Sequence, residues 1–338
     1  MTTVEALDER LSGPTPGVIQ TLSELDGDLL VLGAGGKMGP TLARMAARAL
    51  KTTGSRRKVI GVSSFSSPEI RSRLDQWGIM TIKADLLAPD ALASLPDAEN
   101  VIYMCGRKFG STGAEWNTWA TNVLLAGLAA RRYSKARIVA FSSGNVYPFE
   151  PVLQGGSTEN TPPGPVGEYA MSCLGRERFF DYYSHEFGLN VLHLRLNYAI
   201  ELRYGILLDI ASQVWNGRPI DLTMGHVNVV WQGYANAVAL QCLRLAASPP
   251  GVLNVTGPET VSIRWLATRL GELMDRQPVF SCTEASSALL SNAARCHCLF
   301  GYPDVSLHTM VEWVAQWVMA GSETLNKPTH FQVRDGKF

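Results

Sequence analysis

Short apolar runs alternate with amphipathic stretches along most of this chain. The runs cover 28–32, 58–62, 79–83, 100–105, 137–142, 190–196 and 252–256, and most of them are apolar nearly throughout. Such runs are typical of parallel strands that are buried on both faces of a sheet. The stretches between them, with 41–50, 116–131, 170–187 and 234–247 the clearest, place apolar residues on one helical face. The alternation predicts an α/β fold with a doubly wound parallel sheet of the Rossmann type.

A glycine-rich turn follows the first apolar run and precedes the first helical stretch. Its spacing is G-x-x-G-x-x-G, and its candidate cofactor contacts are Gly33, Gly35, Gly36, Lys37, Met38 and Gly39. Glycine permits a tight turn, a close approach of backbone to a pyrophosphate, and close packing of helix on strand. The N–H groups and the positive end of the following helix attract phosphate. The turn therefore predicts a binding site for NAD or NADP.

The pattern also divides the chain into regions. Residues 1–26 form an N-terminal extension, and 27–198 form the dinucleotide-binding domain, to which 226–256 return. The alternation is interrupted at 199–225, and the chain after 257 is mostly helical. We expect 199–225 and 257–320 to form a smaller, mostly helical substrate domain. The polar tail, 321–338, is expected to extend over the surface.

Composition narrows the classes of partner. The 30 basic and 30 acidic side chains cancel, so the chain lacks the basic excess of a nucleic-acid binder. The sequence shows neither a signal peptide nor an apolar run long enough for a membrane span, which predicts a cytoplasmic protein. Six scattered cysteines form no disulfide framework, and Cys296-His297-Cys298 lacks the usual spacing of a metal site, so no metal is expected.

The end of the second apolar run bears on the choice between NAD and NADP. An acidic residue there usually binds the ribose hydroxyls of NAD, but none occurs from 29 to 68. Ser63 and Ser64 stand there instead and could hold a 2′-phosphate, helped by a nearby cation. The sequence therefore favours NADP over NAD. The candidate cations are Lys37, Arg71 and Arg73, and the candidates for the adenine edge are Asp85 and Leu86.

Four further motifs add to the glycine turn. They are Thr121-Asn122-Val123, Ser142-Ser143 followed by Val146-Tyr147, Tyr169 in 167–173, and Asn254-Val255-Thr256-Gly257-Pro258. With these motifs the chain, from about residue 27 to 320, resembles the extended short-chain dehydrogenase/reductase family of NAD-dependent epimerases and dehydratases. The resemblance implies that Ser143 bonds the reacting oxygen, that Tyr169 is the acid/base and that Asn122 belongs to the cofactor site. It also implies a sugar nucleotide or related polyol as substrate, and a homodimer paired through 116–131 and 170–187.

One position departs from the family pattern. The family has a lysine four residues after the tyrosine, where this chain has Cys173. That lysine lowers the tyrosine pKa and holds the nicotinamide ribose, and a neutral thiol cannot do so. Three interpretations follow: an enzyme with a less activated tyrosine, another cation such as Arg176 in the lysine's place, or a protein that no longer does this chemistry. The function hypotheses are therefore an NAD(P)-dependent oxidoreductase and a non-catalytic NAD(P)-binding sensor or partner protein.

Overall fold

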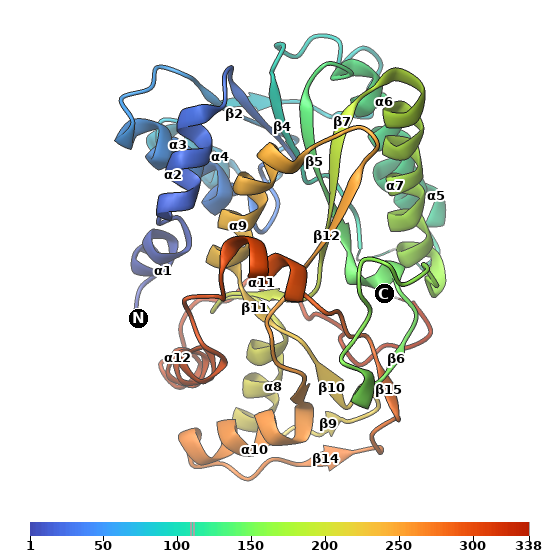
Figure 1. Ribbon diagram of the computed structural model, residues 1–338. Coiled ribbons are helices and arrows are strands. Elements are labelled where there is room, and N and C mark those ends of the chain that lie inside the picture. The colour runs from blue at the N-terminus through green and yellow to red at the C-terminus, as the bar shows by residue number, and fades with distance from the viewer. Residues whose placement is uncertain (109, 111, 338) are drawn as a thin grey trace.

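A parallel sheet of seven strands forms the centre of the computed structural model, which describes residues 1–108, 110 and 112–337. The strand order is β12-β7-β5-β4-β1-β2-β3, and each neighbouring pair is parallel (Figure 1). The strands are β1 (Leu29–Leu32), β2 (Val59–Ser63), β3 (Met80–Lys83), β4 (Asn100–Tyr103), β5 (Arg137–Ser143), β7 (Asn190–Leu196) and β12 (Gly251–Val255). The predicted doubly wound α/β sheet is confirmed.

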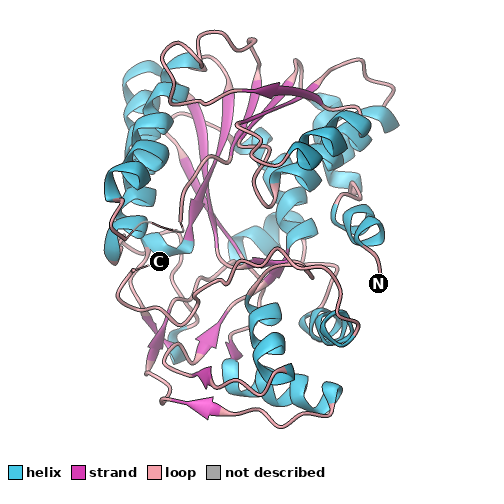
Figure 2. Cartoon of the chain, turned by 180° about the vertical axis from the view of Figure 1, so that it is seen from behind, coloured by secondary structure: helices cyan, strands magenta, loops and turns pink. Residues whose placement is uncertain are grey.

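Helices cover both faces of this sheet (Figures 1 and 2). On one face lie α2 (Pro16–Glu24), α3 (Gly39–Thr52), α4 (Pro68–Gln76) and α9 (Gln232–Gln241), and on the other α6 (Leu125–Arg132) and α7 (Gly167–Phe187). Strand β1 shows why the predicted runs are apolar: Leu29 and Val31 join the core on the first face, and Leu30 and Leu32 join the core on the second. A strand buried on both faces needs apolar residues at successive positions.

The predicted helix at 116–131 is interrupted by a π-helical turn. The segment consists of α5 (Glu115–Trp119), the turn η1 (Ala120–Leu124) and then α6. Such turns widen a helix locally and occur often at functional sites. Here the turn contains Asn122, whose side chain is completely buried.

A second core lies beyond the carboxyl ends of the strands. It is built on α8 (Ile206–Trp215), α10 (Ile263–Met274) and α12 (Leu307–Met319), which pack against one another. The remaining elements of the structure beyond β5 are η2 (Gly144–Val146), β6 (Glu150–Pro151), η3 (Val152–Gln154), β8 (Ala199–Ile200), β9 (Ile220–Asp221), β10 (His226–Val227), β11 (Val230–Trp231), η4 (Cys242–Leu245), β13 (Val261–Ser262), β14 (Phe280–Ser281), β15 (Ser287–Ala288) and α11 (Ala294–Phe300).

Both ends of the chain are packed into these cores. Leu7 and Leu11 of α1 (Val4–Leu11) belong to the second core, although the sequence suggests an extension outside it. The expectation of a tail extended over the surface is wrong at Thr329 and Phe331, which are 3% and 4% exposed. Phe331 fills an apolar site in the second core, which explains the difference; residue 338 lies outside the described residues. In the described ranges, no helix combines the length and apolar character needed to cross a bilayer.

Candidate active site

The glycine turn joins β1 to α3 at the carboxyl edge of the sheet. Gly33 has a φ of +90°, a conformation that favours glycine. A Cβ at position 39 would lie 2.5 Å from the carbonyl oxygen of Ala34, so glycine is needed there for the start of α3 to pack against the turn. A Cβ at position 36 would meet, among the described atoms, only the carbonyl oxygen of Gly33 at 3.3 Å. The backbone at Gly36 thus borders the open space that a pyrophosphate needs.

The residues between these glycines face different surroundings. Met38 precedes α3 and is buried, and within the described chain no side chain caps this helix end by a hydrogen bond. The N–H groups of the first turn therefore suit an anion. The Lys37 ammonium donates to the carbonyl oxygen of Ala199 at 2.7 Å and lies 4.6 Å from the centre of the Tyr204 ring. Burial lowers the pKa of Lys37 to about 8.

The end of β2 lies beside the glycine turn. The Ser63 hydroxyl would stand 2.7 Å from a Cβ at Gly35, so Ser63 closely approaches the turn, and Ser64 is exposed next to it. Two of the three candidate cations are bound elsewhere: Lys37 at Ala199, and Arg73 in a 3.0 Å ion pair with Asp8. Arg71 donates to the Thr81 hydroxyl at 3.0 Å.

After β3, the two candidates for the adenine edge differ in exposure. Asp85 is exposed and accepts a hydrogen bond from the backbone of Leu87 at 3.1 Å, whereas Leu86 is buried. The Asp85 carboxylate therefore closes its own turn, and Leu86 contributes to the core under this edge of the sheet.

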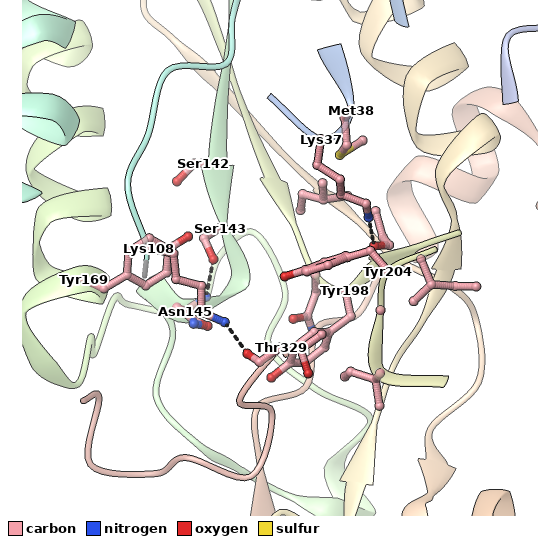
Figure 3. Close-up of a pocket in the computed structure, with 16 residues that line it drawn as sticks. Lys37, Met38, Lys108, Ser142, Ser143, Asn145, Tyr169, Tyr198, Tyr204 and Thr329 are labelled. Carbon is pink, nitrogen blue, oxygen red and sulfur yellow. Dashed lines mark hydrogen bonds between the residues drawn. The ribbon is translucent and has the colours of Figure 1, made fainter. Parts of the chain in front are cut away.

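The candidate acid/base pair meets where β5 ends and α7 begins. Ser143 is the last residue of β5, and its hydroxyl accepts a hydrogen bond from the backbone of Asn145 at 3.1 Å. Tyr169 stands in the first turn of α7, and both side chains point into one cavity (Figure 3). The structure thus brings together the two residues to which the family resemblance gives roles at the reacting oxygen.

The surroundings of Tyr169 keep its phenol protonated. Burial, reinforced by the neighbouring Cys173 thiol, raises the pKa of Tyr169 well above its usual value, and Arg176 and a hydrogen bond with Ser143 offset only part of this. Cys173 is itself completely buried, packs with Tyr169, Val146 and Tyr147, and does not line the cavity within the described structure. Burial raises the pKa of the Cys173 thiol as well, so it stays neutral.

Arg176 and Asn122 lie behind the cavity and hold its wall together. The Arg176 guanidinium is buried and donates to the carbonyl oxygen of Phe141 at 2.7 Å and to Asn122 Oδ1 at 2.9 Å. Asn122 Nδ2 in turn donates to the Ser172 hydroxyl at 2.8 Å. Both side chains therefore join β5, η1 and α7, and Asn122 supports the site without lining the cavity where Ser143 and Tyr169 meet.

The cavity itself has a volume of about 200 Å³ and lies between the glycine turn, the end of β5 and the start of α8. Several of its lining residues were not singled out from the sequence: Lys108, Asn145, Tyr198, Tyr204 and Thr329. Lys108 and Tyr198 follow the strands β4 and β7, so their position at the carboxyl edge could have indicated them. Thr329 comes from the tail, and nothing in its sequence signals the contact.

A second cavity of about 320 Å³ lies on the other side of the tail segment 327–331. Cationic or titratable side chains lining it are Arg203, Arg218, Lys327 and His330, with the carboxylate of Asp209 on the same wall. Arg203 is buried and paired with Glu201 and Asp8, both at 3.0 Å, whereas Arg218 is exposed.

The fold and the glycine turn define a Rossmann-type protein with its candidate site at the carboxyl edge of the sheet. Residues 29–200 match the model of the NAD dependent epimerase/dehydratase family, and the chain belongs to this family. This agrees with the resemblance stated from the sequence. Among curated proteins, none matches the chain by sequence.

Solved structures of similar fold cover most of the chain. UDP-glucuronic acid 4-epimerase from Bacillus cereus, in complex with UDP-glucuronic acid and NAD, has a TM-score of 0.72 at 17% identity, covering 86% of this chain and 99% of that one. UDP-glucose 4-epimerase from Thermotoga maritima, with UDP-glucose, has a TM-score of 0.71 at 16% identity, covering 87% and 99%. UDP-glucose 4-epimerase from Thermus thermophilus, in complex with NAD, has a TM-score of 0.71 at 18% identity, covering 86% and 98%.

Proposed function

We propose that this protein is an NAD(P)-dependent oxidoreductase of the epimerase/dehydratase type that acts on a hydroxyl of a sugar nucleotide. The observation that carries the proposal is the shared cavity: Ser143, Tyr169 and the glycine-turn residues Lys37 and Met38 all line it. The space left at Gly36 fits a pyrophosphate, and the uncapped start of α3 fits its charge.

The residues of the cavity divide the chemistry among them. A bound nicotinamide ring supplies the hydride acceptor and donor. The Ser143 hydroxyl hydrogen-bonds the reacting oxygen of the substrate, and the Tyr169 phenol exchanges the proton of that oxygen. Because the raised pKa keeps Tyr169 protonated, little of the phenolate that must take the proton of a substrate hydroxyl is present at neutral pH. Oxidation of the hydroxyl is therefore slow at neutral pH.

The second cavity supports the substrate class. Arg218 and Lys327 give it a cationic lining that suits the diphosphate of a nucleotide. Two of the structurally similar proteins named above hold UDP-linked sugars. For the cofactor, Ser63 and the absence of an acidic residue from 29 to 68 support NADP binding at least as tight as that of NAD.

A second candidate function rests on Cys173. The thiol supplies no charge where the family has an ammonium, and burial leaves Tyr169 protonated. A protein that binds NAD(P) without turnover, as a sensor or partner subunit, fits these two facts. The candidates differ in whether Tyr169 transfers a proton.

Incubation with UDP-glucose or UDP-glucuronic acid and NAD or NADP separates the two functions. We expect new sugar-nucleotide isomers, dehydrated products or a rise in absorbance from reduced cofactor, with the rate increasing at alkaline pH. Tyr169→Phe should abolish this reaction, whereas Tyr302→Phe, at an exposed tyrosine outside the cavity, should leave it unchanged. Turnover that survives Tyr169→Phe would refute the mechanism, and cofactor binding without turnover of any UDP-sugar would favour the sensor.

A further inference from the structure

Among the described residues that line the cavity beside Tyr169, the positively charged side chains are Lys37 and Lys108. Their placements differ (Figure 3). Lys37 lies on the side of the glycine turn, where it contacts the Ala199 carbonyl oxygen and the Tyr204 ring. The Lys108 ammonium lies 5.9 Å from the centre of the Tyr169 ring. Lys108 is therefore the cavity lysine whose ammonium lies over the Tyr169 ring.

The backbone leading to Lys108 is fixed by the π-helical turn. Lys108 belongs to the loop after β4. The backbone N–H and carbonyl of its neighbour Arg107 are both hydrogen-bonded by the side chain of Asn122. The Arg107 N–H donates to Asn122 Oδ1 at 2.7 Å, and Asn122 Nδ2 donates to the Arg107 carbonyl oxygen at 3.0 Å. Because Asn122 also bonds Ser172 of α7, one side chain ties the Lys108 loop to the helix that carries Tyr169.

The ammonium group is held from a third direction by the tail. Lys108 Nζ donates to the carbonyl oxygen of Thr329 at 3.1 Å. Asp209 of α8 accepts from the backbone N–H and the hydroxyl of Thr329 at 2.8 Å and 2.6 Å. A charged side chain that is oriented by partners on separate elements is preorganised.

The pKa of Lys108 keeps its amine charged at neutral pH. Burial lowers the pKa of Lys108 to about 8, opposed in part by the Asp209 carboxylate. Lys108 is therefore mostly protonated at pH 7. Arg176 also lowers the pKa of Tyr169, but it donates to Phe141 and Asn122 and does not line the cavity within the described structure.

We infer that Lys108 is a positioning residue whose ammonium stabilises the phenolate of Tyr169, in place of the lysine that the family has where this chain has Cys173. The inference rests on the proposed function, because it assigns the missing cation of that site. In this protein the positive charge comes from Lys108, in the loop after β4 across the edge of the cavity. In the family pattern it comes from a lysine one helical turn after the tyrosine. Since phenolate and ammonium stabilise each other, the two groups titrate as a coupled pair.

The test measures the ionisation of position 169 in the protein without substrate. A tyrosine with several ring fluorines, acidic enough to ionise while the Lys108 ammonium is still charged, is placed at 169 alone, and its fluorine resonance is followed with pH. We expect Lys108→Met to raise the midpoint by about one to three pH units, the usual effect of one nearby opposite charge. Lys108→Arg keeps the charge and should restore most of that shift. Adding Cys173→Lys to Lys108→Met should also lower the midpoint again.

Lys37→Met is the matched control, because it removes the other ammonium of the same cavity. It should leave the midpoint of position 169 nearly unchanged. An unchanged midpoint in Lys108→Met, or an equal shift in Lys37→Met, overturns the inference. Because this readout needs no turnover, an absence of UDP-sugar activity would count against the proposed function alone. Where turnover is found, Lys108→Met should lower kcat about 10- to 1,000-fold, corresponding to one to three pKa units.

Discussion

At the scale of single residues, burial decides the charge of the cavity. Tyr169 and Cys173 are both kept neutral because their ionised forms are poorly solvated, and the two lysines lose part of their basicity for the same reason. The family resemblance singled out Ser143, Tyr169 and Cys173 from the sequence. The sequence could not identify Lys108 as their neighbour, because that contact depends on a loop geometry set by Asn122, a residue from a separate helical segment.

The partly buried side chain of Lys37 gives the stability of the protein a definite pH dependence. Below pH 8 this ammonium is charged in the folded and unfolded states, and the folded state carries the cost of burial. Between about pH 8 and the ordinary value of 10.5, the folded protein releases this proton while the unfolded chain keeps it, so the cost declines and is absent above 10.5. Lys37→Met should therefore raise the free energy of unfolding at pH 7 by about 1–3 kcal/mol, after the loss of one hydrogen bond.

Urea unfolding of wild type and Lys37→Met at pH 7 and at pH 10 measures this difference. The advantage of the variant should shrink at the higher pH. A difference that stays the same at both values would show that burial of the Lys37 ammonium does not destabilise the fold.

At the scale of elements, α7 is fixed to the sheet by a buried ion pair. Glu177 of α7 accepts from Arg195 Nε and Nη2 at 3.0 and 2.7 Å, and from the Ser142 hydroxyl at 2.5 Å. Burial alone would raise the pKa of Glu177, but the hydrogen bonds and charge of Arg195 hold it below its usual value. These contacts orient the helix that carries Tyr169 against the strand that ends at Ser143.

Glu177→Leu should therefore lower the free energy of unfolding by about 3–5 kcal/mol, because it leaves the Arg195 charge buried and uncompensated. Glu186→Leu, at an exposed position of the same helix, should change it by less than about 0.5 kcal/mol. Thermal and urea unfolding compare the two variants. Equal effects of both substitutions would mean that the ion pair does not stabilise the position of α7.

The elements also show where sequence reasoning succeeds. The strands of the sheet were predicted with bounds within two residues, because a doubly buried strand leaves a continuous apolar run. The π-helical turn at 120–124 was not predicted, since a one-residue widening hardly alters helical periodicity. The buried part of the tail was missed because Phe331 stands alone among polar neighbours and its burial depends on the second core.

At the scale of the whole molecule, exposed apolar side chains gather on one set of helices. The helices α5 to α7, with η1, carry a group of exposed large apolar side chains: Trp116, Leu124, Leu128, Met171, Phe179, Tyr182 and Phe187. An exposed patch of this kind marks an interaction surface. It coincides with the segments through which the family resemblance implies a homodimer, and we propose that two copies pair through it.

Sedimentation at micromolar concentration tests the pairing. Wild type should sediment as a dimer, and Tyr182→Glu should shift it to monomer because a carboxylate within an apolar interface is poorly solvated. Trp265→Glu, at a similarly exposed aromatic residue on α10, is the control and should remain dimeric. A monomeric wild type, or a dimer that tolerates Tyr182→Glu, would contradict the proposed interface.

Calorimetric titration of wild type and Gly36→Val with NADP and with NAD tests most directly whether the glycine turn holds the dinucleotide. We predict that wild type binds both, with NADP at least as tight, and that Gly36→Val binds neither while keeping the circular dichroism of the folded protein. The reason is local: a Cβ at 36 meets only the Gly33 carbonyl among the described atoms, so the added side chain enters the space assigned to the pyrophosphate. Equal cofactor affinity in wild type and Gly36→Val would contradict the claim that the dinucleotide binds at this turn.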